Sequence, residues 1–148
     1  MRRSLIALTL TLPVLAGPAL ADTVTLTTDR SVTEAMNALS AAVSEAGATV
    51  FARVDHAEGA QSVDMTLPEA QLLIFGNPQL GTPAMLDDPL AGLVLPLRVL
   101  VYDDAGTTTI AYEEVEDMFD DLQIDDDADY VKAMEGALQK LTAAAAGA

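Results

Sequence analysis

The stretch LPLRVLVYDDAGTTTIAYEE, residues 95–114, decides the fold that the sequence predicts. Leucine and valine dominate residues 95–102, which is typical of a strand, and Pro96 lies near its start, where a missing backbone donor is tolerated. The residues Asp103-Asp104-Ala105-Gly106 form a turn signal, and residues 107–112 supply a second strand. The stretch therefore predicts an antiparallel β-hairpin.

The segments before this hairpin predict a strand, a helix and two more strands. Residues 23–27 alternate as a short strand does, and residues 49–55 and 69–75 read as two further strands. Between the strands at 23–27 and 49–55, Ser31 and Glu34 have the spacing of a capping box. Apolar residues follow at helical intervals until Gly47, which predicts an amphipathic helix.

A final helix is expected to begin near Asp127 or Asp129, and the tail from residue 142 is expected to fray. Its apolar stripe comprises Val131, Met134, Leu138, Leu141 and Ala145. The order strand, helix, four strands, helix predicts an α+β fold. We expect a two-layer sandwich with the order β-α-β4-α, in which a mainly antiparallel sheet carries both helices on one face.

The N-terminal residues have the pattern of a secretory signal peptide. Arg2 and Arg3 precede an apolar run over residues 5–16, and Ala19-Leu20-Ala21 matches a small-x-small cleavage site. We expect cleavage after Ala21 and export, which in a bacterium means a periplasmic location. Residues 22–148 are then expected to form one domain with no span across a membrane.

The charge of the predicted mature chain limits its partners. Without Arg2 and Arg3, five Lys and Arg residues face 23 Asp and Glu residues, a formal charge of −18. This charge argues against nucleic acid and against anionic membrane surfaces as partners. Because the chain has no cysteine, thiolate catalysis and cysteine-ligated metals are excluded. We also expect no cofactor.

Four strings resemble the domain of unknown function family 302. They are FARVDHA at residues 51–57, LIFGNPQLGTPAM at 73–85, LPLRVLVYDD at 95–104 and IAYEE at 110–114. The resemblance covers residues 31–141 and implies a fold like that of the TATA-binding protein, with the order β-α-β4-α. It implies no established activity, substrate or catalytic residue.

The constrained segment 76–93 is the first candidate site. Gly76 and Gly81-Thr82 approach the phosphate-binding pattern G-x-x-x-x-G-K-[ST], but no lysine follows Gly81 and the prolines remove backbone donors. Asn77, Gly81 and Thr82 therefore either shape a rigid loop or line the wall of a small-molecule pocket. In either case, apolar side chains are expected to tuck beneath the loop: Met85, Leu86, Leu90 and Leu93.

Two further candidates have weaker chemistry. His56, the only histidine, is interpreted either as a hydrogen-bonded residue at a strand end or as a ligand contact. Residues 113–129 hold ten carboxylates, but aligning Asp125 with the first ligand of an EF-hand puts Tyr130 where glycine is needed. We therefore expect a solvated connector and no metal site, with a weak divalent-cation site as the alternative.

The strands are apolar on both faces. The face expected under the helices includes the even-numbered residues 50–56 and 70–74 and the odd-numbered residues 95–101. The opposite face is expected to carry Phe51, Leu73, Phe75, Leu100 and Tyr102, with Arg53 and Arg98 among them. Such a surface indicates a homodimer interface or a ligand, unless the 76–93 loop covers it.

These observations favour an exported, non-enzymatic domain that self-associates or binds a small organic ligand. The ligand contacts expected from the sequence are His56, Asn77, Gly81, Thr82, Arg53 and Arg98. The alternatives are an enzyme of unrecognised type that acts between the 76–93 loop and the sheet, and a weak divalent-cation binder.

Overall fold

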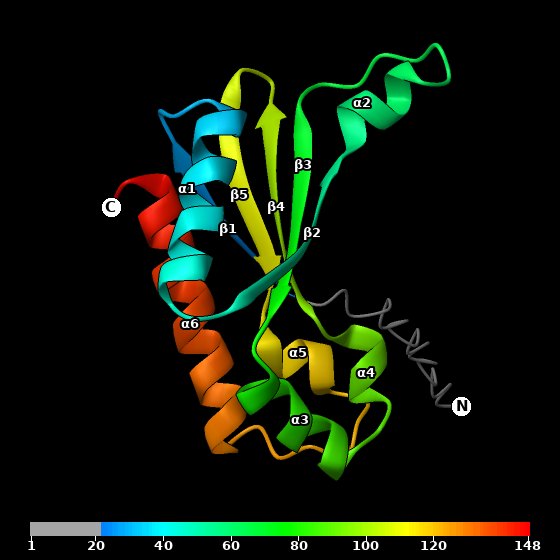
Figure 1. The fold of residues 1–148 in the computed structure, drawn as a ribbon, viewed down its shortest axis with the longest axis vertical. Helices are drawn as coiled ribbons and strands as arrows, with labels where there is room; N and C mark the ends of the chain where they lie inside the picture. Colours follow the sequence, from blue (N-terminus) through cyan, green and yellow to red (C-terminus); the bar gives the residue numbers. More distant parts are fainter. Residues whose placement is uncertain (1–21) are drawn as a thin grey trace, which may run out of the picture.

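A computed structural model describes residues 22–148, which contain a five-stranded antiparallel sheet with the order β1-β5-β4-β3-β2 (Figure 1). The strands are β1 (Thr23–Thr28), β2 (Thr49–Asp55), β3 (Ala70–Gly76), β4 (Leu97–Asp104) and β5 (Thr107–Glu113). Strands β2 to β5 follow one another as a meander, and β1 pairs with β5. The α+β fold predicted from the sequence is confirmed. The predicted leader and its cleavage site lie outside the described residues.

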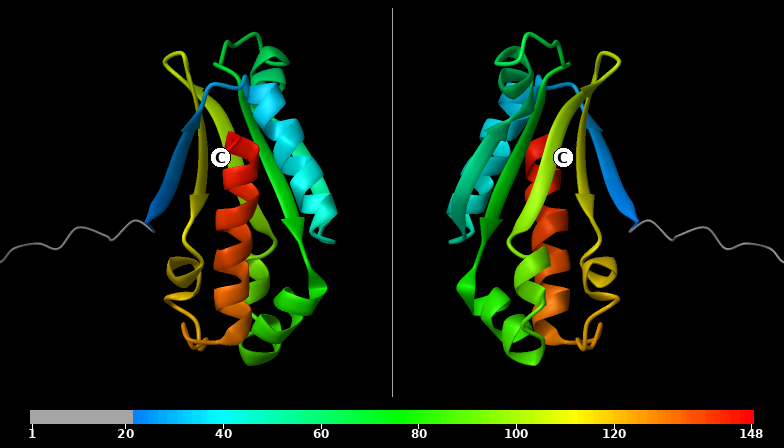
Figure 2. Two further views of the ribbon diagram at one scale, coloured as in Figure 1. Left: turned by 90° about the vertical axis from the view of Figure 1, so that its left-hand side faces the viewer. Right: turned by 90° about the vertical axis from the view of Figure 1, so that its right-hand side faces the viewer.

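The two long helices, α1 (Val32–Glu45) and α6 (Asp129–Ala146), pack on the same face of the sheet (Figure 2). The predicted capping box begins α1: the Ser31 hydroxyl accepts from the Glu34 backbone N–H at 3.3 Å, and the Glu34 carboxylate accepts from the Ser31 N–H at 2.9 Å. Gly47, with φ of +76°, follows the helix in the left-handed region, where a side chain would be strained. We call the other side of the sheet the open face.

The C-terminal end of α6 is fixed beside the end of β1. Arg30 Nη1 donates to the carbonyls of Ala144 at 3.0 Å and Ala145 at 2.7 Å, and the Thr28 hydroxyl donates to the Ala146 carbonyl at 2.8 Å. These bonds satisfy carbonyls that lack a partner within the helix. The expectation that the tail frays is therefore wrong, because the helix continues to Ala146.

The core lies between the sheet and these two helices, and β4 presents the face that the sequence predicted. Leu97, Val99 and Val101 are 6%, 0% and 0% exposed. The predicted stripe of α6 is buried with them. The prediction for β3 is wrong: Leu73 lies opposite Val99, and both Leu73 and Phe75 are buried against the helices.

A β-bulge explains the error in β2. The register between β2 and β3 shifts between Val50 and Ala52, so Phe51 is an extra residue and the alternation reverses beyond it. Ala52 and Val54 therefore turn to the open face. Arg53 turns to the helix side, where Nε donates to Gln71 Oε1 at 2.8 Å and Nη1 donates to Asn37 Oδ1 at 2.7 Å.

Four short helices occupy segments that the sequence analysis treated mainly as loops. They are α2 (His56–Gln61), α3 (Pro78–Asp87), α4 (Ala91–Val94) and α5 (Val115–Phe119). Helices α3, α4 and α5 gather beyond one end of the sheet, around the projecting N-terminal half of α6 (Figure 1).

We expect Leu39→Ala and Leu86→Ala to have very different effects on stability. Leu39 is fully buried in α1, so its truncation should lower the free energy of unfolding by about 2–5 kcal/mol. Leu86 is 79% exposed in α3, so the same change should stay within about 0.5 kcal/mol. Urea unfolding of both variants measures this difference, and equal midpoints would contradict the assignment of the core.

Candidate ligand-binding cavity

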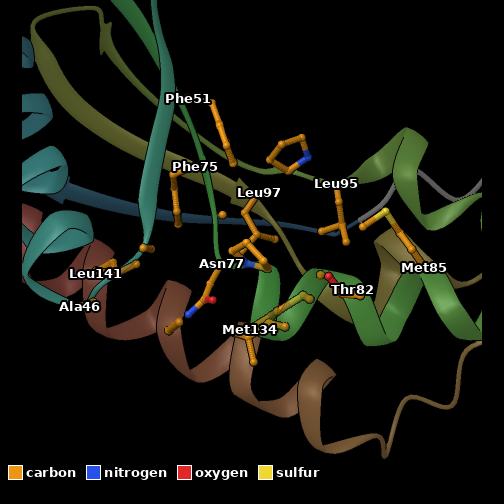
Figure 3. A pocket seen from close by; sticks show the side chains of 17 residues that line it. Ala46, Phe51, Phe75, Asn77, Thr82, Met85, Leu95, Leu97, Met134 and Leu141 are labelled. Atoms are coloured by element: carbon orange, nitrogen blue, oxygen red, sulfur yellow. The ribbon is translucent and has the colours of Figure 1, made fainter.

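A cavity of about 300 Å³ lies at the end of the sheet where β3 leaves it and β4 enters (Figure 3). The sheet side is formed by Phe51, Phe75 and Leu97, while α6 contributes Met134, Ala137 and Leu141. Helix α3 and the residues just after α1 complete the wall. The cavity therefore sits at the junction of both layers with the group of short helices.

The Gly76-Asn77-Pro78 sequence builds one wall by starting α3. Asn77 is the N-cap, and its Oδ1 accepts from the Gln79 backbone N–H at 2.9 Å. Its own carbonyl accepts from Leu80 and Gly81, both at 3.0 Å, and Pro78 at the first helical position has no N–H. The first turn of α3 thus has its backbone donors satisfied.

Gly76 allows an aromatic ring to lie against the end of β3. A Cβ at this position would come 3.2 Å from Phe51 Cε2, which is a tight contact. The bulge in β2 provides Phe51 for this place, and the ring is 57% exposed. Phe51 therefore stands at the mouth of the cavity, half covered by the protein and half in solvent.

The far end of α3 is held by two carboxylates. Asp87 Oδ2 accepts from the Tyr130 hydroxyl at 2.6 Å, which joins α3 to the start of α6. Asp88 accepts from the backbone N–H groups of Gln123 at 3.0 Å and Leu90 at 2.9 Å, and these two bonds hold the pKa of its carboxyl below the usual range. The Tyr130 contact fixes this wall of the cavity relative to α6, and the Gln123 contact fixes it relative to the segment between α5 and α6.

The environment of Tyr130 raises its pKa to about 12. Burial contributes most, and the hydrogen bond to Asp87 adds to it because the anionic acceptor disfavours the phenolate. The negative charges of Asp87 and Asp125 act in the same direction. The Tyr130–Asp87 contact should therefore persist throughout the physiological pH range.

The chemistry of the lining is apolar with two polar side chains. Asn77 and Thr82 supply an amide and a hydroxyl, and neither group titrates near neutral pH. The other lining residues are alanine, glycine, proline, leucine, methionine and phenylalanine. Such a surface binds by shape and burial, with a few polar groups to orient the bound molecule.

The structure brings together three of the six residues expected to contact a ligand. Asn77, Gly81 and Thr82 line the cavity. His56 is exposed at the start of α2, directly after β2, whose bounds match the predicted residues 49–55, and it does not line the cavity.

The two predicted arginines lie elsewhere, each in its own contact. Arg53 is bonded to Gln71 and Asn37 on the helix side of the sheet, so its predicted place on the open face is wrong. Arg98 is on the open face and pairs with Glu113 at 3.1 Å. Their side chains are 42% and 46% exposed, so solvent screens the pair and it contributes little to stability.

The interface candidates also separate. Leu100 and Tyr102 lie half-buried on the open face, as predicted, whereas Leu73 is in the core and Phe75 forms part of the cavity wall. The residues expected to tuck under the segment 76–93 are instead exposed: Met85, Leu86, Leu90 and Leu93. Ala84 and Ala91 are buried in their place, because α3 and α4 turn these small side chains inward.

Sequence reasoning missed the helical contributions to the cavity, including Ala46, Met134 and Ala137. Met134 belongs to the predicted apolar stripe of α6, but nothing in the pattern distinguishes a side chain that lines a cavity from one in the core. The small side chain of Ala137 leaves space for the cavity. An alanine in the sequence indicates such a space only when the element that lies opposite, here α3, is known.

Comparison with known proteins identifies the family. The model of the family described as "Domain of unknown function DUF302" matches residues 24–145. The chain belongs to this family. A solved DUF302 structure, described as "Crystal structure of uncharacterized conserved protein DUF302 from Bacillus stearothermophilus", is similar with a TM-score of 0.67 and 20% identity. The match covers 84% of this chain and 95% of that one, and it supports the fold alone.

Two curated relatives of this DUF302 chain share part of its sequence. The "Fluoride-specific ion channel FluC 1" of Brucella suis and the protein of the same name from Brucella abortus are both 42% identical over 83 residues. The match covers 56% of this chain, and 33% and 31% of the two relatives. The chain thus spans about a third of the length of the curated relatives it matches. Within residues 22–148, no helix is both long enough and apolar enough to cross a bilayer.

We expect Asp87→Asn to lower the pKa of Tyr130 from about 12 towards 10, because the phenol loses its anionic acceptor. The folded-state pKa lies above the unfolded one, so the stability that this contact contributes is complete below pH 10 and declines as pH rises towards 12. Phenolate absorbance measures the shift, with Tyr130→Phe to assign the step.

Asp29→Asn is the matched control, since Asp29 is exposed and distant in sequence from this contact. If Asp29→Asn moved the step as far as Asp87→Asn does, net charge would explain the shift and the specific contact would not.

Proposed function

We propose that this DUF302 chain is an exported, non-enzymatic domain that binds a small organic molecule in the cavity between α3, α6 and the end of the sheet. The observation that carries the proposal is the cavity itself. Its volume of about 300 Å³ lies at the lower end of the range typical of small-ligand pockets, about 300–1,000 Å³. Its apolar lining and two polar side chains are also typical of such pockets.

The energetics favour an occupant. Phe51 is more than half exposed at the mouth, so a ligand that covers its ring removes apolar surface from water. Each Å² covered is worth about 25 cal/mol. The wall needs little rearrangement, because the N-cap at Asn77 and the Tyr130–Asp87 bond hold α3 at both ends. A site that is already ordered loses less entropy when the ligand binds.

The two alternatives fit the described residues less well. An enzyme would need a group that titrates or attacks at the cavity, where the polar side chains are Asn77 and Thr82. For a divalent-cation site, no three carboxylates within residues 22–148 group closely enough. Lys132 pairs with Asp127 at 2.6 Å in the acidic connector and holds the pKa of that carboxyl low.

The names of the Brucella relatives raise the possibility of fluoride, but the cavity does not suit this ion. A small anion needs several donors or cations around it. The lining offers one amide and one hydroxyl, and the N–H groups in the first turn of α3 are occupied. We therefore propose an organic ligand for this chain.

We also propose that two copies associate through the open face. This face keeps Leu100 and Tyr102 of the expected interface but not Leu73 and Phe75, which are buried against the helices. The face carries Ala52, Val54, Leu72, Ile74, Leu100 and Tyr102. Val54 is 38% exposed, and the ion pair of Arg98 and Glu113 adds no net charge. Two copies of residues 22–148, each with a formal charge of −18, repel each other, so association is favoured on a face that is apolar and carries little net charge.

Ligand binding is tested with N-phenyl-1-naphthylamine, a neutral dye that fluoresces in apolar surroundings. Ala137→Phe places a ring in the cavity and should weaken binding by about tenfold or more. Ala133→Phe is the matched control, because Ala133 is exposed on the same helix and does not line the cavity. Equal affinities in both variants, or no binding by the wild type, would refute the proposal.

Association is tested by sedimentation at low and moderate salt. The wild type should dimerise more tightly at moderate salt, because screening weakens the repulsion between copies. Leu100→Glu should give a monomer with unchanged helix content, while Ala133→Glu adds the same charge outside the open face and should leave the dimer intact. A wild type that remains monomeric at high concentration in both salts would contradict the proposal.

A further inference from the structure

We propose that the ligand of this cavity is uncharged, with an apolar body and one hydrogen-bond acceptor that meets the amide of Asn77. Anions of the same shape are rejected. This inference rests on the proposed function and names the chemical class that the site selects. Three independent features carry it: the composition of the lining, the state of the α3 N-terminus and the overall charge of residues 22–148.

The lining has no group that can neutralise a charge. All of its side chains are uncharged, and none of them titrates near neutral pH. A charged group drawn into this space would lose its hydration and gain no ionic partner, which is strongly unfavourable. An apolar group has no such hydration to lose, and it gains contacts with Phe75, Leu97 and Met134.

The N-terminus of α3 would normally attract an anion, because the first N–H groups of a helix point outward without partners. Here those groups are occupied. Gln79 N–H is bonded to Asn77 Oδ1, Leu80 and Gly81 N–H are both bonded to the Asn77 carbonyl, and Pro78 has none. The helix end that borders the cavity therefore offers no backbone donor to a phosphate or carboxylate.

The overall charge of residues 22–148 also opposes an anion. Next to the lining in sequence, the acids Glu45 and Glu135 are balanced by the bases Arg98 and Lys140. Arg98 adjoins Leu97, but its side chain lies on the open face in the pair with Glu113. With a formal charge of −18 over residues 22–148, the surroundings repel anions before they reach the mouth.

Asn77 supplies the remaining polar contact. Its Oδ1 is used by the N-cap, which leaves the two N–H groups of Nδ2 as donors at the cavity wall. Among the described residues, no hydrogen bond joins Nδ2 to another side chain or carbonyl. A ketone, ester or ether oxygen on the ligand matches this donor, whereas a ligand that brings only donors does not.

Two dyes with one skeleton test the charge selection. N-phenyl-1-naphthylamine and 1-anilinonaphthalene-8-sulfonate differ by a single sulfonate group. We expect the sulfonate to bind at least about tenfold more weakly, with Ala137→Phe and Ala133→Phe assigning each signal to the cavity. If neither dye binds, the proposed function fails. If both bind the cavity equally well, the function stands and the neutral class is overturned.

Displacement of the neutral dye tests the acceptor. Methyl octanoate should compete and octanoate should not, because the two differ in charge on the same chain. Asn77→Ser keeps a residue type that caps helices but removes the amide. This variant should lower the affinity for methyl octanoate more than the affinity for the dye, because the dye has no carbonyl. An equal loss for both would show that Asn77 acts through α3 and not as a donor to the ligand.

Discussion

The position of α6 is the constraint on which the rest of this DUF302 structure depends. Arg30 and Thr28 bind the last carbonyls of the helix and fix its C-terminal end beside the end of β1. The helix rises about 27 Å over its 18 residues, and its N-terminal half projects beyond the sheet (Figure 1). That half still carries apolar side chains such as Val131 and Met134, which need cover that the sheet cannot give. Helices α3 and α5 supply the cover, and the cavity is the space left where α3, α6 and the sheet meet.

Local signals in the sequence were sufficient to predict the order of the strands and the two long helices, because each signal depends on only a few neighbouring residues. The capping box at Ser31 and Glu34 and the turn before Thr107 depend only on neighbouring atoms. The face of β3 was not predictable in this way. Residues 72–75 are all apolar, so alternation is absent, and only pairing with β4 sets Leu73 against the helices. The bulge at Phe51 is likewise a property of two strands together, and it reversed the expected place of Arg53.

The candidate site was partly predictable for the same reason. Asn77, Gly81 and Thr82 stood out because proline and glycine punctuate their segment, and all three line the cavity. The punctuation was nevertheless interpreted as a loop, although Asn77 followed by Pro78 is also a helix start. Ala46 and Ala137 had no signal of their own, since a small residue leaves a space only relative to what lies opposite. The sequence alone therefore indicates the segment that forms one wall of the cavity, but not the residues that lie opposite that wall.

One residue links the fold to the chemistry of the cavity. Asn77 begins α3 by giving its side-chain oxygen and its carbonyl to the first turn, which is a local requirement of the helix. The same bonds remove the donors with which a helix N-terminus would hold an anion, and they leave the amide nitrogen of this lining residue free of a hydrogen bond within the described residues. The selectivity proposed for the ligand thus follows from how the chain leaves β3. A cap by aspartate would support α3 equally well but would place a carboxylate where this chain has a neutral donor. The choice of asparagine is therefore informative about the ligand, because helix stability alone does not require it.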